Sequence, residues 1–82
     1  MRKGKVCGSV WATKKHELLN GVKFLEVKLS QNETIIATDT VGAGTGDEVL
    51  VVFGRPASEI SPFPTDTAIL GIVDKNEKEA SF

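Results

Sequence analysis

The 82-residue sequence predicts a single all-β domain spanning residues 1–82, a small five-stranded barrel or sandwich with an OB-like β-barrel as one candidate. Three observations predict this class. Five short segments are rich in alternating or β-branched residues, polar or glycine- and proline-containing turns separate them, and no segment shows a long helical period. Residues 75–82 form only a polar C-terminal tail.

The first predicted strand covers about residues 5–13 and shows a two-residue alternation. Successive side chains of a strand point to opposite faces, so Val6, Gly8 and Val10 are expected together on one face and Cys7 on the other. The alternation therefore predicts one continuous inner face along the whole strand.

Two further strands are predicted to form a hairpin. The second strand covers about residues 22–29, and the third covers about residues 34–40, which are rich in β-branched side chains. The polar residues 30–33 between them are typical of a hairpin connection.

The second half of the chain begins with the glycine cluster of residues 42–46, which suits a tight strand-to-strand turn. The fourth strand is predicted over residues 49–53 and the fifth over residues 67–73. Between them, residues 55–64 hold three prolines, and Pro56 is expected to open a single helical turn.

The fourth and fifth strands have no polar alternation, and this is the feature that matters most for function. A strand that is apolar on both faces needs cover on both sides. The cover is either internal, from the helical turn and the proline-rich loop, or a neighbouring subunit, and the sequence leaves both explanations open. If a subunit supplies it, the candidate interface residues are Val49, Val51, Phe53, Ile69 and Ile72.

Composition and charge exclude several classes of function. The net charge is −1, which provides no basic field for nucleic acid or an anionic membrane. No signal peptide or transmembrane segment is apparent, so a cytoplasmic location is expected. The single cysteine excludes a disulfide within one chain, and Cys7 and His16 are the only soft metal ligands. We therefore expect no metal and no cofactor.

Each motif that suggests chemistry has a plainer interpretation. The glycine cluster is followed by two carboxylates and a strand, so a turn is favoured over a phosphate site. His16 and Cys7 lack the partners of a catalytic set, which makes a small enzyme a weak alternative. Trp11 and Phe24 keep open an OB-type nucleic-acid binder, and an adaptor module is a further alternative. Asp39 is interpreted as a strand-end residue rather than a metal ligand.

Several blocks of sequence together resemble the vertex protein family of bacterial microcompartments, the pentameric proteins of carboxysomes and of ethanolamine and propanediol compartments. They occur in the family's order and cover about nine-tenths of the chain. One departure is the segment after Gly54, where Arg55-Pro56 replaces the family's common Ser-Ser. The blocks are residues 6–10 (VCGSV), 12–14 (ATK), 23–25 (KFL), 39–47 (DTVGAGTGD), 49–52 (VLVV) and 64–74 (PTDTAILGIVD).

The resemblance implies an OB-like barrel that forms a cyclic pentamer and caps the corners of a shell in the bacterial cytoplasm. Its partners would be four further copies of itself and the hexameric shell proteins of the flat facets. The implied activity is structural, without catalysis. The candidate for a loop near the symmetry axis, lining an axial pore, is the glycine cluster Gly42, Ala43, Gly44, Thr45 and Gly46.

Overall fold

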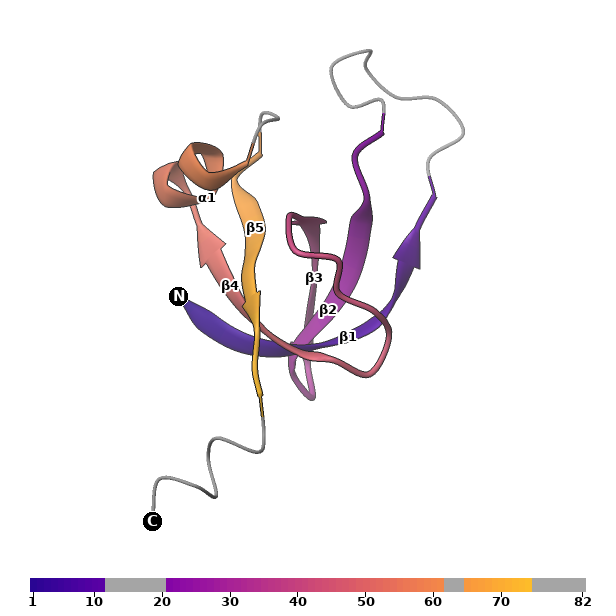
Figure 1. Cartoon of the computed structure of the whole chain (residues 1–82). Coiled ribbons are helices and arrows are strands. Elements are labelled where there is room, and N and C mark those ends of the chain that lie inside the picture. Colours follow the sequence, from indigo (N-terminus) through magenta and orange to yellow (C-terminus); the bar gives the residue numbers. More distant parts are fainter. Residues whose placement is uncertain (12–20, 62–64, 75–82) are drawn as a thin grey trace.

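The computed structural model describes residues 1–11, 21–61 and 65–74. Their five strands form a closed barrel in the order β1-β2-β3-β5-β4, with one short helix, α1, between β4 and β5 (Figure 1). The predicted five-stranded barrel is therefore confirmed. The elements are β1 (Arg2–Val10), β2 (Phe24–Ser30), β3 (Glu33–Asp39), β4 (Glu48–Phe53), α1 (Arg55–Ile60) and β5 (Thr67–Ile72).

Strand β1 begins earlier than the sequence predicted, because residues 2–5 pair with β4. Their side chains are mostly charged and exposed, so hydropathy gives no sign of the pairing. The strand ends at Val10, and residues 12–13 of the predicted strand lie outside the described residues.

A bulge at Cys7 changes which side chains of β1 face the interior. Val6 pairs with Val27, whereas Gly8 pairs with Glu26, so Cys7 is an extra residue. Paired residues share a face, and Val27 and Glu26 lie on opposite faces of β2. Val6 therefore points inward while Gly8 points outward. The prediction that Val6, Gly8 and Val10 share one face is wrong for this reason.

The barrel interior is filled by small and medium-sized aliphatic side chains. Gly4 allows β1 and β2 to approach closely, since a Cβ there would lie 2.5 Å from Val27 Cγ1 and 2.9 Å from Leu29 Cδ2. Leu29, Ile35 and Phe53 pack against the core from its edges. The buried cluster is Val6, Leu25, Val27, Ala37, Ala43, Val49, Val51 and Ile69.

A short parallel contact closes the barrel. Thr38 and Asp39 of β3 lie beside Ala68 and Ile69 of β5, and this two-residue register is the only parallel pairing among the described strands. The remaining strand pairs are antiparallel. Because β3 and β5 meet only there, Asp39 and the loop after it lie at the point of closure.

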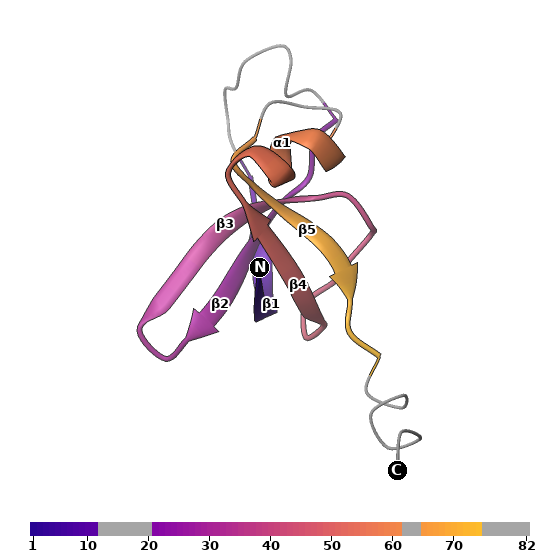
Figure 2. The same ribbon diagram turned by 90° about the vertical axis from the view of Figure 1, so that its left-hand side faces the viewer.

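Helix α1 covers one end of the outer β4–β5 face, as Figure 2 shows. Pro56 occupies its first turn, as predicted, and Ala57 is completely buried. Val52 of β4, Ala57 and Ala68 of β5 form a second small buried cluster outside the barrel. The internal explanation for the doubly apolar strands is therefore correct for this part of the face.

Candidate assembly surfaces

Beyond α1, the outer face of β4 and β5 carries apolar side chains without full cover. Leu50 pairs with Gly71 and Val51 pairs with Ile69, so Leu70 is an extra residue in β5. Leu70 follows the buried Ile69 and points outward, where it is 39% exposed beside the half-buried Leu50, and the bulge turns Gly71 to the same outer face. We call Leu50, Leu70 and Gly71 the β4–β5 surface.

The structure corrects three of the five candidate interface residues. Val49, Val51 and Ile69 are fully buried in the barrel interior, so their side chains present no surface to a neighbour. Phe53 is half-buried against the same core. Ile72 pairs with Val49 near the end of β5 and is 46% exposed, so it remains available. In an unbroken apolar strand, hydropathy does not distinguish the inner face from the outer one.

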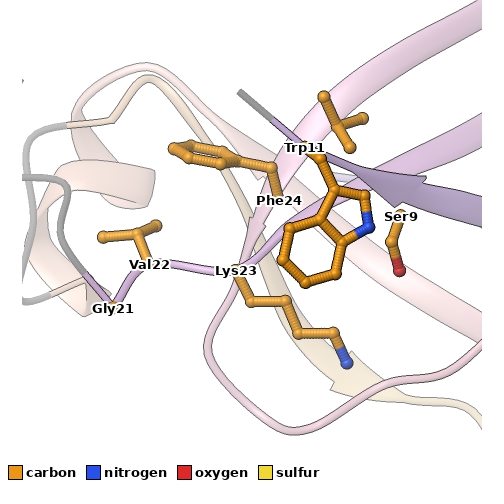
Figure 3. A pocket seen from close by; sticks show the side chains of 7 residues that line it. Ser9, Trp11, Gly21, Val22, Lys23 and Phe24 are labelled. Carbon is orange, nitrogen blue, oxygen red and sulfur yellow. The ribbon is translucent and has the colours of Figure 1, made fainter. Parts of the chain in front are cut away.

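A second apolar surface lies where β1 ends and β2 begins. It surrounds a hollow of about 310 Å³, and Trp11 beside it is 91% exposed. Figure 3 shows the Trp11 indole beside the aliphatic stem of Lys23, while the Phe24 ring is turned away from it toward the side of Val22. We call this feature the Trp11 hollow, and its lining residues are Ser9, Val10, Trp11, Gly21, Val22, Lys23 and Phe24.

The loop after β3 is held by the Asp39 side chain. Its Oδ1 accepts hydrogen bonds from the backbone N–H groups of Val41, Gly42 and Ala43 at 3.0, 3.0 and 3.2 Å. Its Oδ2 lies 3.8 Å from Lys23 Nζ, which also donates to the Ala43 carbonyl at 3.1 Å. The carboxylate thus gathers three consecutive amides at the point where the barrel closes.

The glycine cluster is a strand-to-strand turn, as predicted, and it is fastened at both ends. Gly46 N–H donates to the Val6 carbonyl at 2.8 Å, and Val6 N–H donates to the Asp47 carbonyl at 2.9 Å. Gly42 and Gly46 have φ angles of 82° and 94°, which favour glycine. Ala43 is completely buried in the core, so its side chain lines no opening.

The remaining four residues of this loop, Gly42, Gly44, Thr45 and Gly46, are exposed. Ala43 is therefore removed from the candidate pore residues, because its methyl group packs inside the barrel of its own chain. The other four positions stay compatible with contact between subunits. Sequence reasoning missed Asp39 as the residue that organises the loop, although an aspartate before a glycine-rich turn is a usable signal.

Cys7 lies on the outward side of the β1 bulge and is exposed. Its Sγ donates to the Glu26 carbonyl at 3.3 Å and to Glu26 Oε1 at 3.5 Å. Partial desolvation, followed by the hydrogen bond and the negative charge of Glu26, raises the pKa of the thiol above its ordinary value. The raised pKa further disfavours the nucleophilic thiolate form of Cys7.

Within residues 1–11, 21–61 and 65–74, no group of three metal-ligating side chains is positioned to hold an ion. In the same part of the chain, no helix has the length and apolar content needed to cross a bilayer. His16 lies outside the described residues. What distinguishes the described surface is its two uncovered apolar areas, the β4–β5 surface and the Trp11 hollow.

Solved structures of pentameric shell proteins have the same fold. The GrpN pentameric microcompartment shell protein from Rhodospirillum rubrum is 40% identical, with a TM-score of 0.79 over 92% of this chain and 95% of that one. The pentameric shell protein MSM0273 from the RMM microcompartment is 35% identical, with a TM-score of 0.82 over 93% of each chain. The barrel of this chain is thus the fold of pentameric microcompartment shell proteins.

Sequence relatives identify the kind of shell subunit. The carboxysome shell vertex protein CcmL of Thermosynechococcus vestitus is 39% identical over an alignment of 83 positions that covers 90% of this chain and 84% of the relative. The family model described as "Ethanolamine utilisation protein EutN/carboxysome" matches residues 1–74. The chain belongs to this EutN/CcmL family of bacterial microcompartment shell vertex proteins.

Proposed function

We propose that this protein assembles as a homo-pentamer that caps the vertices of a bacterial microcompartment shell in the cytoplasm, among hexameric shell proteins. One observation carries the proposal. The outer β4–β5 face keeps an uncovered apolar surface, in a chain whose relatives are named as pentameric shell and shell vertex proteins. A neighbouring copy is the cover that fits both facts.

In a cyclic assembly, this surface would bind a neighbouring copy of the chain. A ring forms when two different patches of the same chain bind each other head to tail and the rotation between copies closes. Flat sheets of hexagonal units do not curve into a closed polyhedron, and fivefold units at the corners supply the missing curvature. This protein therefore contributes to the shell through the shape of its ring and the angle that the ring sets between adjoining facets.

A structural role without catalysis is supported by the names of the relatives, which are shell proteins. The chemistry of the surface agrees with that role, because desolvation and the neighbouring Glu26 raise the pKa of the exposed Cys7 and so disfavour a nucleophilic thiolate. These relatives give no support to the nucleic-acid-binding or adaptor alternatives that Trp11 and Phe24 left open.

The mass of the native protein tests the pentamer. One chain has a mass of 8.8 kDa, so five copies give about 44 kDa by light scattering or native mass spectrometry. Co-expression with a hexameric shell protein should then give closed particles by electron microscopy, and open sheets or tubes without this chain. A well-folded protein that remains at 8.8 kDa at high concentration would contradict the proposal.

The exposed part of the glycine loop is proposed to lie near the fivefold axis. Thr45 is exposed at its tip, and the flanking glycines allow backbones of neighbouring copies to approach. In a Cys7→Ser background, Thr45→Cys should be joined by a short bis-maleimide into covalent dimers, since the one thiol of each chain allows one link per chain. Cross-linking no faster than for Asn32→Cys, at an exposed position of the β2–β3 turn, would place the loop away from the axis.

A further inference from the structure

We propose that adjacent copies in the ring join through two unlike surfaces: the β4–β5 surface of one copy binds over the Trp11 hollow of the next. This inference rests on the proposed pentamer and names the two halves of its contact. The occupant of the hollow is thus a second copy of this chain, with Leu70 as the central side chain of the incoming surface.

The positions of the two surfaces suit a head-to-tail contact. A ring needs two patches that face different directions on each chain, so that every copy binds one neighbour on each side. In Figure 1 the β4 and β5 strands stand on one side of the barrel, and β2 with the end of β1 rises on the other. Strand β4 pairs with β1 only at residues 2–5, at the start of β1, whereas Trp11 follows the end of β1. The two surfaces are therefore separated along β1.

Trp11 is the strongest single indication of a partner. It is the only tryptophan of the chain and is 91% exposed. Tryptophan is enriched at the centre of protein interfaces, where it gives a large contact area at a small loss of conformational freedom. The hollow beside it, about 310 Å³, is at the lower end of the volumes that hold small molecules, which suits an aliphatic side chain such as Leu70.

The charged groups that border both surfaces already have partners within the chain. Lys23 Nζ lies 3.1 Å from the Ala43 carbonyl oxygen and 3.8 Å from Asp39 Oδ2, so its aliphatic stem is what it presents to the hollow. Lys3, which is paired with Leu50 across β1 and β4, has its Nζ 3.5 Å from Glu48 Oε2. A second copy can therefore cover these areas without leaving an unpaired charge.

The single tryptophan makes the contact directly measurable. In the wild-type ring, Trp11 should emit at short wavelength and resist quenching by acrylamide. Leu70→Lys, made on the opposite surface, should lower the mass to that of one chain and expose Trp11 to quencher. Leu70 lies in β5 and Trp11 directly follows β1, and these two strands are not neighbours in the barrel, so in a folded chain the substitution reaches the indole across a subunit contact.

Ile36→Lys is the matched control. Ile36 is an exposed apolar residue of β3, at 54%, and lies outside both surfaces. It pairs with Glu26, which offers the new lysine an opposite charge. This variant should keep the mass of the ring and the protection of Trp11. Trp11→Ala should weaken association by about 30-fold or more, the effect of losing an interface hot spot.

Circular dichroism of each variant separates dissociation from unfolding. If Leu70→Lys fails to fold, Leu70→Ala and Ile36→Ala replace the lysine pair, and only the former should shift ring dissociation to higher protein concentration. Full rings with a shielded Trp11 in the Leu70 variants, or rings of wild-type strength in Trp11→Ala, would overturn these contact surfaces and leave the pentamer standing. A wild-type protein that never exceeds one chain would overturn the pentamer as well.

Discussion

The Asp39 carboxylate is expected to stabilise the barrel by holding the loop that closes it. The substitution that tests this is Asp39→Ala, which removes the acceptor of three backbone amides and the partner of Lys23. The side chain of Asp39 is only 3% exposed, so water does not readily take its place. The expected result is a clear loss of stability without loss of the core packing.

The size of the loss depends on which amides water can reach. Val41 and Gly42 are exposed and can bond to solvent after the substitution. Ala43 is buried, and leaving its N–H without a partner costs about 1–3 kcal/mol. The Lys23 pair is 3.8 Å long with its lysine half exposed, which adds at most about 1 kcal/mol. The sum is about 1–4 kcal/mol, or a fall in Tm of about 5–30 °C for a domain of this size.

Thermal unfolding followed by circular dichroism at one fixed protein concentration measures this effect, because association also shifts Tm. The matched control is Asp47→Ala, which removes one hydrogen bond, 2.8 Å long, to the exposed Gly44 amide and should cost less than about 1 kcal/mol. Hydrogen exchange should show the Ala43 amide losing protection in Asp39→Ala alone. Equal losses of Tm in the two variants would refute the reasoning.

Three other substitutions have defined outcomes. Gly4→Ala places a Cβ 2.5 Å from the buried Val27 Cγ1 and should destabilise the fold by about 1–3 kcal/mol in urea unfolding. Val51→Asp buries a charge in the barrel and should unfold the chain, so a folded monomer by circular dichroism would contradict the core assignment. The raised pKa of Cys7 leaves less thiolate at pH 8, so alkylation by iodoacetamide should be slow. Removing the negative charge with Glu26→Gln should lower that pKa and speed the reaction; an unchanged rate would exclude the carboxylate as a cause.

The strands of the second half were predictable because their signal is strong. Runs such as residues 49–53 and 67–73 are rich in β-branched and aliphatic residues, and Gly54 directly follows the first while Pro64 shortly precedes the second. Helix α1 was predictable from Pro56, which is suited to the first turn. The start of β1 at Arg2 was not, since a backbone can pair while its charged side chains stay in water.

The two bulges explain why the assembly surface was only half predictable. Each inserts one residue, at Cys7 in β1 and at Leu70 in β5, and so reverses the inward or outward direction of the side chains beyond it in the strand. Hydropathy carries no mark of such an insertion when the residues on both sides are apolar or small. The sequence therefore indicates that β5 has surplus apolar surface, while only the register shows that Leu70, and not Ile69, carries it.

The different directions of Ile69 and Leu70 decide whether a mutation in β5 affects folding or association. Ile69 fills the core of every copy whether or not a ring exists, so its loss is a loss of folding. Leu70 is 39% exposed in the single chain, so its burial can be gained only from a partner. Because successive side chains of a strand point to opposite faces, β5 serves the barrel through Ile69 and a neighbour through Leu70. If Leu70→Lys lowered folding stability as much as Val51→Asp, this separation of roles would be wrong.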